Sequence, residues 1–418
     1  MRLIHSTDRA ALNRWLKARS ARLEEAEPVV RRIVEDVRRH GDRALIRYAE
    51  KLDGTDLRRE GFLVSREEVR QASRQVPRGF IGAIRLAARN IRAAARRQLP
   101  PAWRLETCAG VEVRQIVRPL DRVACYIPGG RFPLPSTVLM SVIPAQVAGV
   151  REILIASPRP APAVLAAADI LGIEKIFRLG GAQAIAAFAY GTESVPRADK
   201  IVGPGNRYVA AAKRLVARDC AIDFVAGPTE LVTVGSRGRP QWIAGDLVAQ
   251  AEHDPDAVAI FITPSRRLAA QVRKAVVNVL SRLRLPVAQQ ALTRQGAIIV
   301  TRDVAEAIEL ANTLAPEHLT LLDGASQFLA RIQSAGSIFL GNNSAVAAGD
   351  YASGTNHILP TGGVARFRGG LSASDFVKTI SVQKLSLSGL DGLRSAIVTL
   401  AMTEGLVAHA HSVVTRFQ

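Results

Sequence analysis

The sequence predicts an α/β protein built on two doubly wound parallel sheets, and three observations lead to this prediction. From Val111 onward, short β-branched runs alternate with helical runs, which is typical of parallel sheets covered by helices. The alternation occurs in two series, and glycine-rich turns follow several of the strand-like runs. The chain has 418 residues, 48% of them hydrophobic, so it is long enough for several domains with large cores.

Residues 6 to about 104 are expected to form one helix after another. Ser6-Thr7-Asp8 offers an N-cap for the first of them. Apolar residues then recur at helical spacing, at Leu12, Trp15 and Leu16. Leu99-Pro100-Pro101 ends the segment, and nothing in it suggests chemistry. We therefore interpret it as a scaffold.

The two series of strands define two domains, which we expect to be doubly wound, incomplete Rossmann-like parallel-sheet domains. No G-x-G-x-x-G motif occurs, so the usual fingerprint does not support a dinucleotide ligand. The strand-like runs lie at 123–127, 153–156, 176–179 and 200–202, and then at 231–234, 259–262, 297–300, 319–322 and 337–340. We assign residues 123–229 to one α/β domain, and residues 26–122 with 230–370 to the other. Residues 1–25 are assigned to a helical arm and residues 371–418 to a helical tail.

The formal net charge of +19 raises the alternative of a nucleic-acid-binding protein. The basic residues are mostly arginines spread along helices at amphipathic spacing, and aromatic residues make up only 5% of the chain. That composition leaves no stacking platform interleaved with the charge. We expect a generally basic surface, with no nucleic acid as partner.

Compartment and membrane association follow from the same composition. Three scattered cysteines, Cys108, Cys125 and Cys220, suggest neither a disulfide framework nor a metal-binding pair. Charged or helix-breaking residues interrupt each apolar run well before the ~18 residues of a membrane span. The first residues contain no apolar signal core. We expect a cytoplasmic protein without a membrane partner.

Three glycine-rich turns follow strand-like runs of the first series, at 126–130, 180–183 and 203–206. In doubly wound sheets, ligands lie at the carboxyl ends of the strands. Glycines let the backbone approach a phosphate closely, and helix N-termini present free N–H groups to it. The turns therefore suggest a nucleotide or phosphate ligand, with plain tight turns as the alternative.

Candidate metal ligands close an apolar helical run at Gln250-Ala251-Glu252-His253-Asp254. Gln250 and His253 are three residues apart, so on a helix they project from one face. Imidazole is a frequent metal ligand, and oxygen donors complete the shell of a borderline cation. The alternative is a polar cluster that caps the end of a buried helix.

Two later stretches contain acid, base and ligand candidates. Pro316-Glu317-His318-Leu319 places a carboxylate beside an imidazole where a helix gives way to a strand, a pair suited to proton transfer, although a solvated turn is the alternative. The stretch 349–361 sets Asp350 and His357 among glycines with few charged neighbours, which favours a functional loop. Glu404 and His409 lie around a helix end in the tail and by themselves resemble surface residues.

These pieces resemble the histidinol dehydrogenase family over nearly the whole chain. The most specific segment is Ile222-Asp223-Phe224-Val225-Ala226-Gly227-Pro228-Thr229-Glu230, followed at the family's spacing by Gln250-Ala251-Glu252-His253. The Pro316–Leu319 segment, the 349–361 loop and the tail pair follow in the family's order.

The resemblance implies a role for each matching position. Zinc would be bound by Gln250, His253, Asp350 and His409, with His409 supplied by the tail of the partner in a homodimer. His318 would be the general base, and Glu317 would activate water. The positions that match substrate contacts are Thr229, Gln250, His253, His318, Asp350, His357, Glu404 and His409, and those that match NAD contacts are Tyr126, Gln183 and Asn206.

The implied reaction is the oxidation of L-histidinol through L-histidinal to L-histidine, with reduction of two NAD molecules. A relative that oxidises another small polyol or amino alcohol is the alternative. The chain departs from the family at Thr229, where serine is usual, and at 344–348, where many members have a Pro-Glu pair. Cys125 adjoins Tyr126 and is a conceivable thiol nucleophile, but we interpret it as a buried strand residue.

Overall fold

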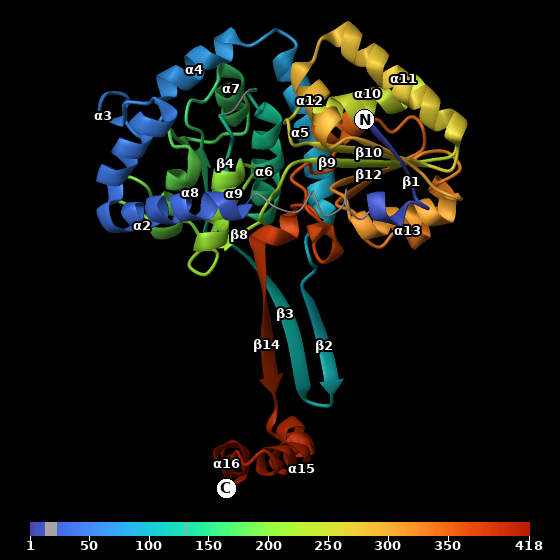
Figure 1. Ribbon diagram of the computed structural model, residues 1–418. Coiled ribbons are helices and arrows are strands. Elements are labelled where there is room, and N and C mark those ends of the chain that lie inside the picture. The colour runs from blue at the N-terminus through green and yellow to red at the C-terminus, as the bar shows by residue number, and fades with distance from the viewer. Residues whose placement is uncertain (13–22, 130–131) are drawn as a thin grey trace.

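The computed structural model describes residues 1–12, 23–129 and 132–418. Two lobes, each built on a parallel sheet, lie side by side, and an antiparallel arm carries the C-terminus away from both (Figure 1). The two sheets confirm the predicted α/β class. The expected helical positions Trp15 and Leu16 lie outside the described residues.

One lobe contains a five-stranded parallel sheet in the order β6-β5-β4-β7-β8. Its strands are β4 (Arg122–Tyr126), β5 (Glu152–Ala156), β6 (Lys175–Phe177), β7 (Lys200–Val202) and β8 (Ala221–Ile222). Its helices are α6 (Pro135–Ala148), α7 (Pro162–Ile170), α8 (Gly181–Tyr190) and α9 (Arg207–Val216). Apolar clusters cover both faces of the sheet, which explains why its strands are nearly continuous apolar runs.

The other lobe contains a six-stranded parallel sheet in the order β1-β11-β10-β9-β12-β13. Its strands are β1 (Arg2–His5), β9 (Glu230–Val234), β10 (Val258–Thr263), β11 (Ala297–Val300), β12 (His318–Leu321) and β13 (Ser337–Leu340). Its helices are α10 (Pro240–Ala251), α11 (Arg266–Leu283), α12 (Pro286–Arg294), α13 (Val304–Leu314) and α14 (Val346–Tyr351). Strand β1 corrects the expected helical arm, because residues 2–5 pair with β11 at the edge of the sheet.

The N-terminal helices pack on the lobe of the five-stranded sheet. They are α2 (Leu23–Tyr48), the π-helix η1 (Ala49–Asp53), α3 (Leu57–Glu60), α4 (Arg66–Gln75) and α5 (Phe80–Arg97). Helix α2 contacts α8 and α9, α4 contacts α7, and α5 contacts α6. These helices therefore belong with residues 123–229, and grouping residues 26–122 with 230–370 was incorrect for them. Their apolar faces were visible in the sequence, but periodicity does not indicate which sheet a face covers.

The arm is a three-stranded antiparallel sheet that ends in two helices (Figure 1). It consists of β2 (Trp103–Cys108), β3 (Val111–Pro119) and β14 (Val377–Leu385), followed by α15 (Leu387–Thr403) and α16 (Val407–Val414). The tail was expected to be helical throughout, so β14 is a correction. Its apolar residues Ile380 and Val382 alternate with polar ones but are 41% and 36% exposed, so no buried face marked the strand.

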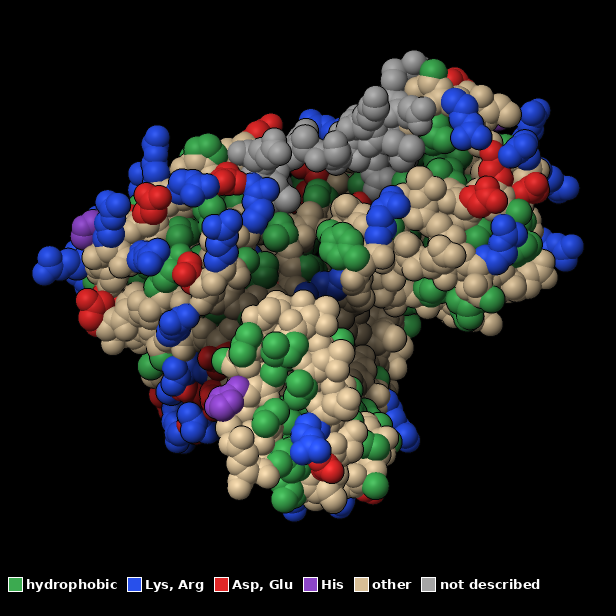
Figure 2. All heavy atoms as spheres, turned by 90° about the horizontal axis from the view of Figure 1, so that it is seen from below, with side chains coloured by type: hydrophobic (Ala, Val, Ile, Leu, Met, Phe, Trp, Pro, Cys, Tyr) green, Lys and Arg blue, Asp and Glu red, His purple; other side chains and the backbone are tan. Residues whose placement is uncertain are grey.

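Charged side chains are distributed over the whole visible surface. Seen from the end of the arm, Lys and Arg side chains are scattered over both lobes among acidic ones and do not gather in one patch (Figure 2). Within the described part of the chain, none of the helices has the length and apolar character needed to cross a membrane.

Candidate active site

Two segments far apart in the sequence meet where neighbouring strands begin. Glu317 and His318 stand at the start of β12, and Thr229 directly precedes β9. The two strands pair in parallel, with His318 opposite Leu231. Glu317 and His318 are 6% and 3% exposed. These residues therefore lie at the amino ends of their strands, unlike the glycine-rich turns of the other sheet.

A chain of hydrogen bonds links Gln250 to Glu317 through Thr229. Thr229 Oγ1 donates to Glu317 Oε2 at 2.5 Å, and the backbone N–H of Glu230 donates to the same oxygen at 2.7 Å. Gln250 Nε2 donates to the Thr229 hydroxyl. Three side chains that the sequence suggested separately therefore form one buried polar network.

His318 is held with one nitrogen directed at the site. Its Nδ1–H donates to the carbonyl of Glu230 at 3.1 Å, which fixes the orientation of the ring. Its Nε2 faces Asp350 Oδ1 at 3.4 Å and has no hydrogen-bond partner among the described residues. Nε2 is therefore the ring nitrogen that faces Asp350.

The charges around His318 shift its protonation. Burial alone would lower the pKa of His318, but the neighbouring Glu317 and Asp350 carboxylates outweigh burial and raise it to about 10. Burial raises the pKa of Asp350, but His318, His357 and His253 outweigh it, and the net pKa lies below the usual range. His318 and Asp350 thus each favour the charged form of the other.

Helix α14 and the loop after it hold Asp350 and His357 in place. The backbone N–H of Val346 at the start of α14 donates to the Asp246 carboxylate, whose pKa burial raises to about 6. His357 Nδ1–H donates to the Asp350 carbonyl at 2.8 Å, and Thr137 Oγ1 of α6 lies 3.3 Å from His357 Nε2. Burial lowers the pKa of His357, which favours the neutral ring. The loop thereby ties the two lobes together beside the site.

One chain brings together only part of the predicted metal-ligand set. Gln250 is buried at the end of α10, whereas His253 is exposed and lies beyond that helix, which ends at Ala251. The prediction that the two share a helix face is therefore wrong. Glu404 and His409 are exposed on the tail helices at the far end of the arm. Among the described residues no group of three or more His, Cys, Asp or Glu side chains is arranged to hold a metal.

The donor types nevertheless suit zinc. An amide oxygen, an imidazole and a carboxylate from Gln250, His253 and Asp350 are chemically suitable ligands, and a tetrahedral shell needs one more. Helices α10 and α14, which position Gln250 and Asp350, pack against each other.

The three residues matched to dinucleotide contacts lie at, or shortly after, the carboxyl ends of strands of the five-stranded sheet. Tyr126 ends β4, and its hydroxyl accepts a hydrogen bond from Gly181 N at 3.1 Å. Gln183 is fully buried in α8, which follows β6. Asn206 follows β7 and caps α9 by accepting from Tyr208 N and Val209 N. All three turns stand at carboxyl ends of parallel strands, where the sequence placed a ligand.

A buried ion pair fixes the turn at Gly203. Lys213 Nζ donates to Asp223 Oδ1 at 2.6 Å and to the Gly203 carbonyl at 2.5 Å. Asp223 Oδ2 accepts from Gly203 N at 2.8 Å. Gly203 has a φ of +113°, and a Cβ there would lie 2.2 Å from the carbonyl oxygen of Tyr126. Only glycine fits this close approach.

Comparison with known proteins identifies the family. The sequence profile described as histidinol dehydrogenase matches residues 16–417. The histidinol dehydrogenase of Methanothermobacter thermautotrophicus is 47% identical over 91% of both chains. The chain belongs to the histidinol dehydrogenase family. The crystal structure of histidinol dehydrogenase from Elizabethkingia anophelis superposes with a TM-score of 0.94 at 38% identity, over 100% of this chain and 98% of that one.

Several residues of this histidinol dehydrogenase family member escaped the sequence analysis. Asp246, Lys213 and Asp223 position the loops that contain candidate residues. Asp223 stands inside the family-specific segment, which was the available signal for it. Cys125 is fully buried, and burial raises the pKa of its thiol, which agrees with a packing role and not with a nucleophile.

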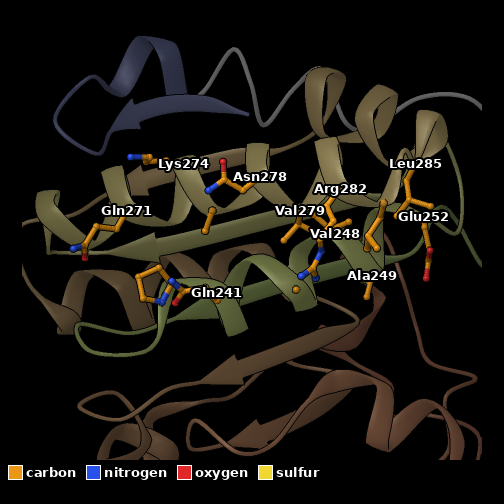
Figure 3. Close-up of a pocket in the computed structure, with 14 residues that line it drawn as sticks. Gln241, Val248, Ala249, Glu252, Gln271, Lys274, Asn278, Val279, Arg282 and Leu285 are labelled. Carbon is orange, nitrogen blue, oxygen red and sulfur yellow. The ribbon is translucent and has the colours of Figure 1, made fainter.

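A groove between α10 and α11 lies apart from the candidate site. It is lined among others by Gln241, Val248, Ala249, Glu252, Lys274 and Arg282 (Figure 3). Of the family-specific segment 250–253, Glu252 lines this groove, but none of the residues to which the resemblance assigns a role does.

Proposed function

We propose that this protein oxidises L-histidinol through L-histidinal to L-histidine, with two NAD molecules reduced in turn. Family membership supports the substrate and the oxidation. The observation that carries the proposal is the buried Glu317–His318 pair, joined through Thr229 to Gln250 and facing Asp350. This arrangement combines a proton acceptor, a second carboxylate and candidate metal ligands within one network.

His318 is proposed as the general base that takes the hydroxyl proton of histidinol while hydride passes to NAD. Its Nδ1–H is engaged by the Glu230 carbonyl, so Nε2 is the nitrogen that exchanges the proton. Glu317 is proposed to draw a proton from water that adds to the aldehyde. Because Glu317 Oε2 already accepts two hydrogen bonds, Oε1 is the oxygen available for this task.

Zinc is proposed as the resident metal, held by Gln250, His253, Asp350 and, from a second copy, His409. Bound there, zinc would orient the imidazole and amine of the substrate. It would also offset the negative charge of Asp350, and the pKa of His318 would then fall toward the range that suits a general base. We propose that Thr229, His357 and Glu404 contact the substrate together with these ligands and His318. Tyr126, Gln183 and Asn206 are proposed to contact NAD.

The tail is proposed to act in a homodimer. His409 and Glu404 are exposed at the end of an arm that leads away from the lobes of its own chain (Figure 1). The tail also exposes large apolar residues, namely Leu387, Leu400, Met402, Leu406 and Val407. Exposed apolar surface of this kind is typical of an interface.

All three cysteines are free, which supports the proposed cytoplasmic location.

The test is NADH formation from L-histidinol before chelation, after chelation and after addition of zinc. Two NADH per histidinol, lost on chelation and restored by zinc, would support the proposal. A panel of small polyols and amino alcohols is included as a control. Activity confined to one of those alcohols would support the proposed oxidation but with a different substrate. Absence of activity from folded, zinc-loaded protein would overturn the proposal.

A further inference from the structure

A carboxylate that the reaction does not use lies at the N-terminus of α8. Asp53 ends η1 on the N-terminal helical layer, and its Oδ2 accepts a hydrogen bond from Gln183 Nε2 at 2.9 Å. The backbone N–H of Gly180 also donates to this carboxylate. A Cβ on Gly180 would lie 2.8 Å from Asp53 Oδ1, so the carboxylate is pressed against the turn. Asp53 therefore occupies the end of α8 where an anion would otherwise bind.

The cluster around this turn contains a buried acceptor without a hydrogen-bond partner among the described residues. Gln183 Oε1 is fully buried and has no hydrogen-bond partner among the described residues. Burial raises the pKa of Asp53 to about 6. Above that pH the ionised carboxylate offers several acceptor sites to a ligand. The hydroxyl of Tyr126, at the same turn, already accepts from Gly181 N. A ligand group that donates hydrogen bonds suits this cluster, and a phosphate, which brings more negative charge, does not.

We propose that the Asp53 carboxylate accepts hydrogen bonds from the hydroxyls of a ribose of the dinucleotide. Through this contact Asp53 selects NAD over NADP. This inference rests on the proposed NAD site at the turns of Tyr126 and Gln183. The vicinal hydroxyls of a ribose supply two donors, and an acidic side chain that accepts them is a recurrent solution in dinucleotide sites. A 2′-phosphate would place a second negative charge beside the carboxylate and would be repelled.

Arg159 lies near Asp53, and its positive charge bears on the choice between NAD and NADP. It is exposed in the turn after β5, and its charge acts on Asp53. With the carboxylate present, the two charges offset each other. With the carboxylate neutralised, the guanidinium is free to attract a phosphate, since arginine suits phosphate recognition.

The test is fluorescence titration of the full-length protein with NADH and with NADPH, which does not require turnover of histidinol. In Asp53→Asn we expect NADH to bind about tenfold more weakly, and NADPH to bind as well as to the wild type or better. Asp53→Ser should change the preference in the same direction. Glu50→Gln removes an exposed charge from the same π-helix and should leave both affinities unchanged. In the double variant Asp53→Asn, Arg159→Gln, the gain toward NADPH should disappear.

Equal weakening of NADH and NADPH in the folded variant would overturn the inference, as would an unchanged preference. Failure of the wild type to bind NADH would also overturn it. A wild type that binds NADH, shows the Asp53-dependent preference and yet leaves histidinol untouched would refute the proposed reaction alone.

Discussion

Thr229 and Glu317 join the starts of β9 and β12 through a hydrogen bond of 2.5 Å, in which the threonine hydroxyl donates to the carboxylate. The same hydroxyl accepts from Gln250. One oxygen atom therefore connects a candidate metal ligand with the carboxylate proposed to activate water. Serine, the residue expected at this position from the family resemblance, would preserve both hydrogen bonds.

Replacement of Thr229 by valine should uncouple these two side chains. The variant keeps the shape but leaves Gln250 Nε2 without its acceptor and removes one donor from Glu317. We expect a loss of about 1–3 kcal/mol in the free energy of unfolding and a fall in kcat of at least about tenfold. Thr229→Ser is the matched control and should remain close to wild type in both chemical denaturation and NADH formation. Equal activity of the valine variant would show that the network has no catalytic role.

Replacement of Glu317 by glutamine should affect the second oxidation more than the first. The amide cannot take a proton from water, so the rate with L-histidinal should fall by about 10²–10⁴. The rate of the first hydride transfer from L-histidinol should fall less. Stopped-flow NADH absorbance with each substrate separates the two steps. Equal losses in both would assign Glu317 to a step common to both.

The raised pKa of Asp53 predicts a pH-dependent difference between the wild type and Asp53→Asn. Its pKa rises from 3.8 to about 6 on folding, so the stability that protonation contributes is present below about pH 4 and is lost as the pH rises through 6. Relative to wild type, the variant should gain about 1–2 kcal/mol between pH 4 and pH 7, less than the full shift implies because the carboxyl is partly exposed. Chemical denaturation at several pH values measures this. A difference that stays constant with pH would contradict it.

Replacement of Lys213 by methionine should be strongly destabilising. Lys213 and Asp223 are 2% and 1% exposed, so the variant leaves a buried carboxylate without its counter-charge. We expect a loss of about 3–5 kcal/mol. The double variant Lys213→Met, Asp223→Asn removes that charge and should recover part of the loss. A loss below about 1 kcal/mol in the single variant, measured by urea denaturation, would show that the pair does not hold the Gly203 turn.

The sequence predicted those parts of the site that local pattern specifies. The change from helix to strand at 314–318, the glycine turns after strands and the polar end of α10 all follow from spacing within one segment. The two parallel sheets followed from the alternation of strands and helices.

Long-range placement was not accessible in the same way. The N-terminal helices have an apolar face, but the side chains they meet on α8, α9, α7 and α6 come from distant segments. Strand β14 is defined by its pairing with β3, and not by burial. In the sequence, Lys213 is one basic residue of an amphipathic helix. The fold shows that its amine points inward to Asp223.

The claim that connects the fold to the function is that His409 of one copy completes the site around Asp350 of another. The direct measurement is NADH formation from L-histidinol by a mixture of Asp350→Asn and His409→Asn proteins, unfolded together and refolded. Each variant alone should be inactive. If the tail acts in the partner, mixed dimers contain one intact site and the mixture should regain up to about a quarter of wild-type activity. If refolded mixtures contain mixed dimers and remain inactive, the tail does not complete a neighbour's site and this account of the active site is wrong.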